Sequence, residues 1–158
     1  YDPSKEVLNL SDGVYSSNSI AAMGIAAHEA GHAMQKLENY APLNLRSAIV
    51  PAVNICSSLS TPMFILGLIF AWQPLVYIGI GLFAASTVFA LVTLPVEFDA
   101  SKRAIQMLSE GGYISGAEEE RNVRKVLSAA ALTYVAAAVT SLLSLLRLIL
   151  IAKRNDRN

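Results

Sequence analysis

No charged residue and no histidine occurs between Arg46 and Glu97. A helix of ~20 apolar residues crosses the ~30 Å hydrocarbon layer of a bilayer, so this segment is too long for one span and long enough for two. An interfacial aromatic residue, an amide and a proline follow one another at 72–74, which marks a turn. We therefore expect a transmembrane hairpin with spans at 48–71 and 75–94.

The rest of the chain also indicates a membrane protein. A second uncharged segment, from Val126 to Leu146, predicts a third span, and Pro51 and Pro62 are expected to kink the first. Hydrophobic residues make up 54% of the chain, charged residues 15%, and the mean hydropathy is +0.47, unlike a soluble globular protein. The 12 basic and 12 acidic residues balance, so the composition does not indicate a nucleic-acid partner.

Both histidines of the chain lie in one motif, His-Glu-Ala-Gly-His at 28–32. Polar residues at 16–19 offer helix N-caps, and we predict a helix over about 20–37 that is apposed to the membrane. Residues i and i+4 lie on one helix face, about 5–6 Å apart, so His28 and His32 can bind one Zn²⁺. Glu29, beside the open metal position, is then placed to act as general base.

A hydrolytic zinc site takes three protein ligands, and no third histidine exists. The third ligand must then be a carboxylate or Cys56, which lies within the first predicted span. Two crossings return the chain to the face from which it started, which brings Glu97 and Asp99 back to the histidine helix. We favour Glu97 as ligand and Asp99 as acceptor for a histidine N–H, because metal-bound imidazoles need such a partner. The reverse assignment stays open, as does a simple i,i+4 pair between Asp99 and Arg103.

Other segments carry weaker signals. Residues 7–10 predict a small β-strand near the N-terminus, and Pro95 separates the second span from an amphipathic helix at 96–109. A residue that stabilises the oxyanion cannot be chosen from several candidates. These candidates are Arg103, Tyr113, Arg121, Arg124 and Tyr134.

The fold class that follows is a mainly α integral membrane protein with three transmembrane helices in this chain. It divides into an N-terminal part of the site with the histidine helix (1–46), a transmembrane hairpin (47–95), a second part of the site (96–125), a third transmembrane helix (126–152) and a charged tail (153–158).

Three stretches, at 27–35, 94–101 and 132–138, closely resemble the YugP-like membrane zinc metallopeptidases. The resemblance runs from Tyr1 to the last span. It implies a zinc site formed by His28, His32 and Glu97, and an N-terminal membrane anchor upstream of Tyr1. A more distant likeness is to gluzincins such as HtpX and the CAAX prenyl protease, where an acid four positions after the ligand glutamate supports a zinc histidine. That position is Ser101 here.

The sequence therefore predicts a membrane-embedded zinc endopeptidase that hydrolyses peptide bonds of peptide or protein substrates near the bilayer surface. The competing hypothesis is a catalytically silent scaffold or metal-binding adaptor that retains the same fold. We expect a multi-pass protein of the cell membrane. Basic residues at 102–103 and 121–125 favour a cytoplasmic active-site face, whereas those at 153–157 favour the opposite orientation.

Overall fold

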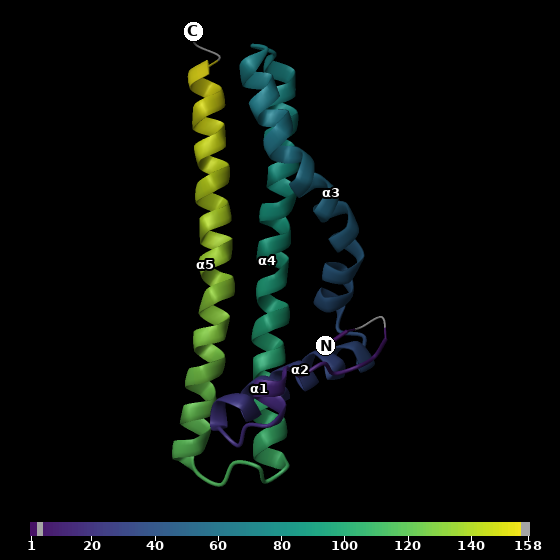
Figure 1. The fold of residues 1–158 in the computed structure, drawn as a ribbon, viewed down its shortest axis with the longest axis vertical. Helices are drawn as coiled ribbons and strands as arrows, with labels where there is room; N and C mark the ends of the chain where they lie inside the picture. The colour runs from purple at the N-terminus through teal and green to yellow at the C-terminus, as the bar shows by residue number, and fades with distance from the viewer. Residues whose placement is uncertain (3–4, 156–158) are drawn as a thin grey trace. The chain divides into compact units, whose positions relative to one another are not determined.

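The structure is a computed structural model that describes residues 1–2 and 5–155 and is mainly helical (Figure 1). Its helices are α1 (Asp12–Tyr15), α2 (Ile20–Leu37), α3 (Ala41–Ile69), α4 (Gln73–Glu110) and α5 (Ala117–Asn155). Three of them, α3, α4 and α5, are long and apolar enough to cross a membrane. The expected three spans are thereby confirmed by length and composition. Arg157 of the predicted tail lies outside the described residues.

The chain forms two compact units. The first, here called the motif unit, contains residues 1–44 and 94–134, and the second, the span unit, contains residues 45–93 and the chain from Val135 onward. The boundaries fall inside α3, α4 and α5, so each of these helices contributes one part to each unit. The five-segment division expected from the sequence stays a prediction.

Helix α2 has the bounds that the sequence predicts. Ser19 is its N-cap, and the hydroxyl of this serine accepts a hydrogen bond of 3.1 Å from the backbone N–H of Ala22. Its C-terminal end is closed by the N–H of Tyr40, which donates to the carbonyl of Gln35 at 2.9 Å. The His-Glu-Ala-Gly-His motif lies in the second half of this helix, as expected.

The predicted break at Pro95 is wrong, because α4 continues through this residue from Gln73 to Glu110. A proline inside a helix removes one backbone hydrogen bond, but neighbouring groups in a packed helix can compensate. The second predicted span and the predicted amphipathic helix are therefore one element. Pro51 and Pro62 also lie inside a continuous helix, and Figure 1 shows α3 changing direction along its length, as expected for kinks at proline.

The predicted N-terminal strand at 7–10 is also wrong. In the described part of the chain, this region forms only an isolated antiparallel bridge between Asp2 and Val7, with N···O distances of 2.9 and 3.3 Å. Val7 and Leu8 are exposed. The residue types of this segment are typical of a strand, but among the described residues it pairs only through this bridge, and a single bridge does not stabilise a strand.

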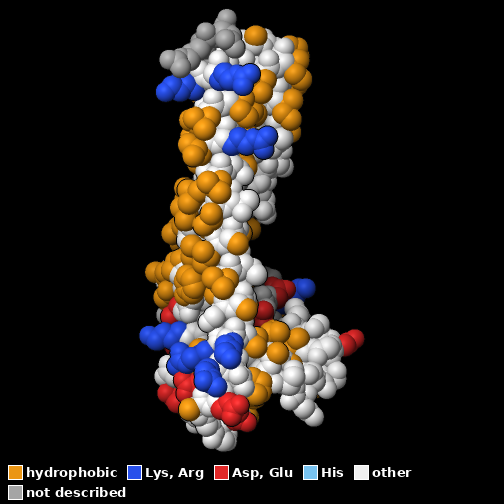
Figure 2. Space-filling view, turned by 90° about the vertical axis from the view of Figure 1, so that its left-hand side faces the viewer, with side chains coloured by type: hydrophobic (Ala, Val, Ile, Leu, Met, Phe, Trp, Pro, Cys, Tyr) orange, Lys and Arg blue, Asp and Glu red, His pale blue; other side chains and the backbone are white. Residues whose placement is uncertain are grey.

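The apolar surface of the span unit is consistent with a lipid environment. Figure 2 shows apolar side chains collected on the face that α5 presents to the viewer. The exposed large apolar residues of α5 within this unit are Val139, Leu142, Leu143, Leu146, Ile149 and Leu150. A patch of this kind is costly in water and is the ordinary surface of a membrane helix.

Candidate metal centre

Helices α2 and α4 approach closely in the motif unit because of one glycine. A Cβ built on Gly31 would lie 2.5 Å from the carbonyl oxygen of Ala100, so a side chain does not fit there. On α4, Val96, Ala100 and Ala104 recur every fourth residue and are fully buried. Gly31 is the fourth residue of the histidine motif, so the close approach of the two helices occurs between the two imidazoles.

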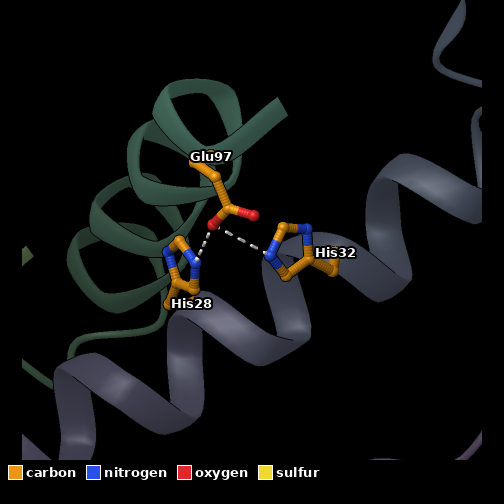
Figure 3. A group of neighbouring side chains, drawn as sticks. All are labelled: His28, His32 and Glu97. Atoms are coloured by element: carbon orange, nitrogen blue, oxygen red, sulfur yellow. Dashed lines mark hydrogen bonds and ion pairs between the residues drawn. The ribbon is translucent and has the colours of Figure 1, made fainter. Parts of the chain in front are cut away.

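This contact brings His28, His32 and Glu97 together (Figure 3). The Nε2 atoms of His28 and His32 lie 3.1 and 3.5 Å from the same oxygen, Oε2 of Glu97. The two rings stand nearly perpendicular, with centroids 4.8 Å apart. The Glu97 side chain is only 3% exposed, so its charge is almost fully removed from water.

The donor set fits a zinc ion. One possible ligand atom from each of the three residues lies within 4.8 Å of the other two. Two imidazole nitrogens and one carboxylate oxygen are the ligands of a His₂Glu zinc site, which keeps a fourth position open. A buried carboxylate facing two imidazoles is favourable when a cation is shared among them.

Each imidazole has a partner for its other nitrogen. His28 Nδ1 lies 3.1 Å from the hydroxyl of Ser101, and His32 Nδ1 lies 3.0 Å from Oε1 of Gln35. Metal-binding histidines usually have such an outer partner, which orients the ring. Neither partner was predicted from the sequence. Gln35 follows His32 by one helical turn, and Ser101 occupies the position where the resemblance to gluzincins predicts an acid, so both signals were present.

Asp99 does not contact a histidine directly, contrary to the prediction. Its Oδ2 accepts hydrogen bonds from Nε2 of Gln35 at 2.8 Å and from Nε of Arg103 at 2.6 Å. Burial acts to raise the pKa of Asp99, which lies beyond the predicted 75–94 span, but the bonds from Arg103 and Gln35 outweigh it and hold the pKa below its usual range. Asp99 therefore contacts Gln35, which in turn faces His32.

Glu29, the predicted general base, follows His28 in α2 and is partly exposed. Its carboxylate lies beside the backbone nitrogen of Tyr1. Among the predicted oxyanion candidates, two arginines are paired with carboxylates and one tyrosine is exposed. Arg103 is held by Asp99 and Glu38, and Arg124 by Glu120, whereas Tyr113 is exposed. Cys56, the alternative third ligand, lies in the span unit.

Helices able to cross a membrane, combined with an HExxH helix and a distant glutamate, define the class of membrane-associated zinc metallopeptidases. The chain belongs to the family described as "Putative neutral zinc metallopeptidase", whose match covers residues 1–153. It is 49% identical over 151 residues to the "Putative membrane protease YugP" of Bacillus subtilis (strain 168). That match covers 96% of this chain and 67% of the relative. No solved structure matches the chain significantly. The resemblance to YugP-like metallopeptidases is thus confirmed.

Proposed function

We propose that this chain is a membrane-embedded, zinc-dependent endopeptidase with His28, His32 and Glu97 as its metal ligands. The observation that carries the proposal is the convergence of two imidazole nitrogens on one buried carboxylate oxygen, at 3.1 and 3.5 Å. Membership of a metallopeptidase family and the printed name of the membrane relative support the same conclusion.

Different residues of the chain would carry out different parts of the reaction. When bound, a zinc ion in such a set lowers the pKa of a water molecule and polarises a carbonyl. Glu29 takes the proton from the attacking water on its carboxylate and transfers it to the leaving amine nitrogen. The outer partners Ser101 and Gln35 keep the two imidazoles oriented while this happens.

The position of Glu97 along α4 supports cleavage near the bilayer surface. Glu97 follows the predicted span end, Leu94, by three residues of one continuous helix, which is about 5 Å of helical rise. Substrates would then be peptide segments that lie at the membrane interface. We place the protein in the cell membrane as a multi-pass protein, and the basic residues of the motif unit favour a site on the cytoplasmic face.

The competing function is a silent scaffold or metal-binding adaptor. A purely structural zinc site gains nothing from a carboxylate next to its first histidine, whereas a hydrolytic site requires a base there. Glu29 therefore favours the enzyme.

The experiment that separates the two functions replaces Glu29→Gln in the full-length protein, purified from membranes. We expect cleavage of an unstructured casein-like substrate to disappear while bound zinc stays at the level of the wild type. Glu118→Gln, at an exposed position of the first turn of α5, is the matched control and should retain activity. Chelator-sensitive proteolysis that survives Glu29→Gln would refute the proposed mechanism, and zinc binding without any proteolysis in the wild type would favour the adaptor.

A further inference from the structure

Gln35 is a fully buried amide one helical turn after His32, with 0% of its surface exposed. An amide group is costly to bury unless its donors and acceptor are paired. All of them have partners here. The Nε2 atom donates to the carbonyl of Val96 and to Oδ2 of Asp99, both at 2.8 Å, and Oε1 faces Nδ1 of His32 at 3.0 Å.

These contacts determine which way the amide points. The carbonyl of Val96 can only accept hydrogen bonds, and the Asp99 oxygen that faces Gln35 also accepts from Nε of Arg103, so the nitrogen of Gln35 must face them. Its oxygen is then left for His32, and that oxygen can only accept. His32 must therefore carry its proton on Nδ1. In the neutral imidazole this leaves the lone pair on Nε2, the atom that faces Glu97.

We propose that Gln35 is a positioning residue that selects the metal-binding nitrogen of His32 and holds its ring toward Glu97. The inference deepens the proposed function and rests on it. Gln35 does not touch the reacting atoms. It acts through His32, by excluding the tautomer in which Nδ1 carries the lone pair and Nε2 the proton.

The amide is itself held in place by charged groups from both helices. Asp99 receives Gln35 and Arg103 on one oxygen, and the guanidinium of Arg103 also donates to Glu38 at 2.6 Å. Arg103 lies over the ring of Tyr40, with its Cζ 5.8 Å from the ring centre. Hydrogen bonds to charged groups are stronger than those between neutral groups, so this network of hydrogen bonds fixes the amide better than water would.

The two histidines differ in this respect. The Ser101 hydroxyl beside His28 can rotate and can either donate or accept, so it does not select a tautomer by itself. Gln35 has no such freedom. We therefore expect its loss to weaken the metal site more than the loss of Ser101.

The test uses Gln35→Met in the full-length membrane protein, with zinc affinity measured by competition with a chromophoric chelator. The methionine keeps the volume but removes every hydrogen bond. We expect about 10–100-fold weaker zinc binding, the usual cost of losing an outer partner, and a smaller loss for Ser101→Ala. Gln106→Met, an exposed glutamine on α4, is the matched control and should bind zinc like the wild type.

A second readout reports the tautomer directly. The chain contains only 2 histidines, so ¹⁵N-labelled histidine gives the signals of two rings by NMR. In the zinc-loaded wild type we expect His32 to show a protonated Nδ1 and a metal-bound Nε2. In the Gln35→Met variant that single form should be lost.

If Gln35→Met does not fold, a second test exchanges the hydrogen-bond donor and acceptor between positions 35 and 99. Gln35→Glu alone puts a carboxylate against Asp99 and should weaken zinc binding. Adding Asp99→Asn supplies a donor to the new carboxylate and keeps an acceptor for Arg103, whereas the carbonyl of Val96 still lacks its donor, so the double variant should recover part of the lost affinity but not all of it.

The failures of the two proposals are distinguishable. Unchanged zinc affinity and unchanged His32 signals in Gln35→Met, or no recovery in the exchange variant, would overturn the role of Gln35 and leave the metal site standing. A wild-type protein that binds no zinc would instead refute the proposed function.

Discussion

The two units of the molecule bury polar groups in different ways. In the span unit the buried polar side chains among the described residues are Ser60, Thr87 and Thr93. Each is a hydroxyl that donates to a carbonyl of its own helix three or four residues earlier. In the motif unit the buried polar side chains are Gln35 and Glu97, an amide and a carboxylate. Both depend on groups from another helix: Glu97 pairs with His28, and the amide nitrogen of Gln35 donates to Val96, whereas only the amide oxygen of Gln35 has its partner in its own helix.

The polar groups whose burial costs the most free energy therefore lie in the motif unit, where the candidate metal centre is. A hydroxyl bonded to its own helix is nearly free to bury, in lipid as in a protein core. A buried carboxylate is not, and its presence in the motif unit needs a compensating positive charge. The comparison therefore locates the chemistry of the chain without reference to the motif, and it can be tested on either unit separately.

The largest effect is expected from the buried carboxylate. Glu97→Gln keeps the shape but removes the charge that faces the two imidazoles, so zinc affinity should fall by more than the about 10–100-fold that an outer partner typically costs. Metal analysis of the purified protein measures it. Asp99→Asn is the comparison variant: it keeps an acceptor oxygen for Gln35 and Arg103, so its loss of zinc affinity should be much smaller. Loss of zinc with Asp99→Asn but not with Glu97→Gln would reverse the ligand assignment.

The next effect tests the close approach of α2 and α4. In Gly31→Ala the added Cβ would meet the carbonyl of Ala100, and overpacking of this kind costs about 1–3 kcal/mol in stability. Thermal unfolding and zinc affinity should both fall. Gly24→Ala, in the same helix, meets only a methyl group of Val123 at 3.7 Å and is the matched control. It should be neutral or stabilising, because alanine favours a helix by about 1 kcal/mol over glycine.

A contradiction would be informative here. Equal stability and equal zinc affinity for the Gly31→Ala and Gly24→Ala variants would mean that the helices can separate without disturbing the site. The contact at Ala100 would then not be what positions Glu97.

The span unit contains a similar close contact with a different expected consequence. A Cβ on Gly79 would lie 2.6 Å from the backbone nitrogen of Phe64, whereas one on Gly81 would meet nothing within 4 Å. Gly79→Ala should therefore lower the thermal stability by about 1–3 kcal/mol, and Gly81→Ala should not. Zinc affinity should be unchanged in both, because the contact lies outside the motif unit. A loss of zinc binding in Gly79→Ala alone would show that the two units are coupled.

The candidate site could be predicted from the sequence to the extent that it depends on chain periodicity. The spacing of His28 and His32 and the return of the chain at Glu97 follow from helix geometry and from an even number of crossings. The outer partners could not be predicted in the same way. Whether Asp99 reaches His32 directly or only through Gln35 depends on the distance between α2 and α4, which are in close contact at Gly31.

The parts of the fold that depend on composition could be predicted from the sequence, whereas the parts that depend on packing between segments could not. The uncharged segments predict the three long apolar helices correctly. Pro95 was interpreted as a break because the local rule says so, yet α4 continues, since tertiary packing can outweigh one lost backbone bond. The strand prediction at 7–10 was wrong because residue types that favour a strand do not form one without a segment to pair with.

The smallest effect is expected from a hydroxyl pair between two helices of the span unit. Thr87 lies with its Oγ1 2.8 Å from the Oγ of Ser141, so it links α4 to α5. Such pairs stabilise membrane helix packing by about 0.6 kcal/mol on average, because the unpaired hydroxyl finds another partner on its own helix. Thr87→Val should therefore lower the unfolding free energy by about that amount and leave zinc binding and proteolysis unchanged. Thr133→Val, whose hydroxyl bonds only to the carbonyl of Ala130 in its own helix, is the matched control. A loss of several kcal/mol in Thr87→Val would contradict the view that the span unit buries only inexpensive polar groups, because this hydroxyl would then be as indispensable as the carboxylate of Glu97.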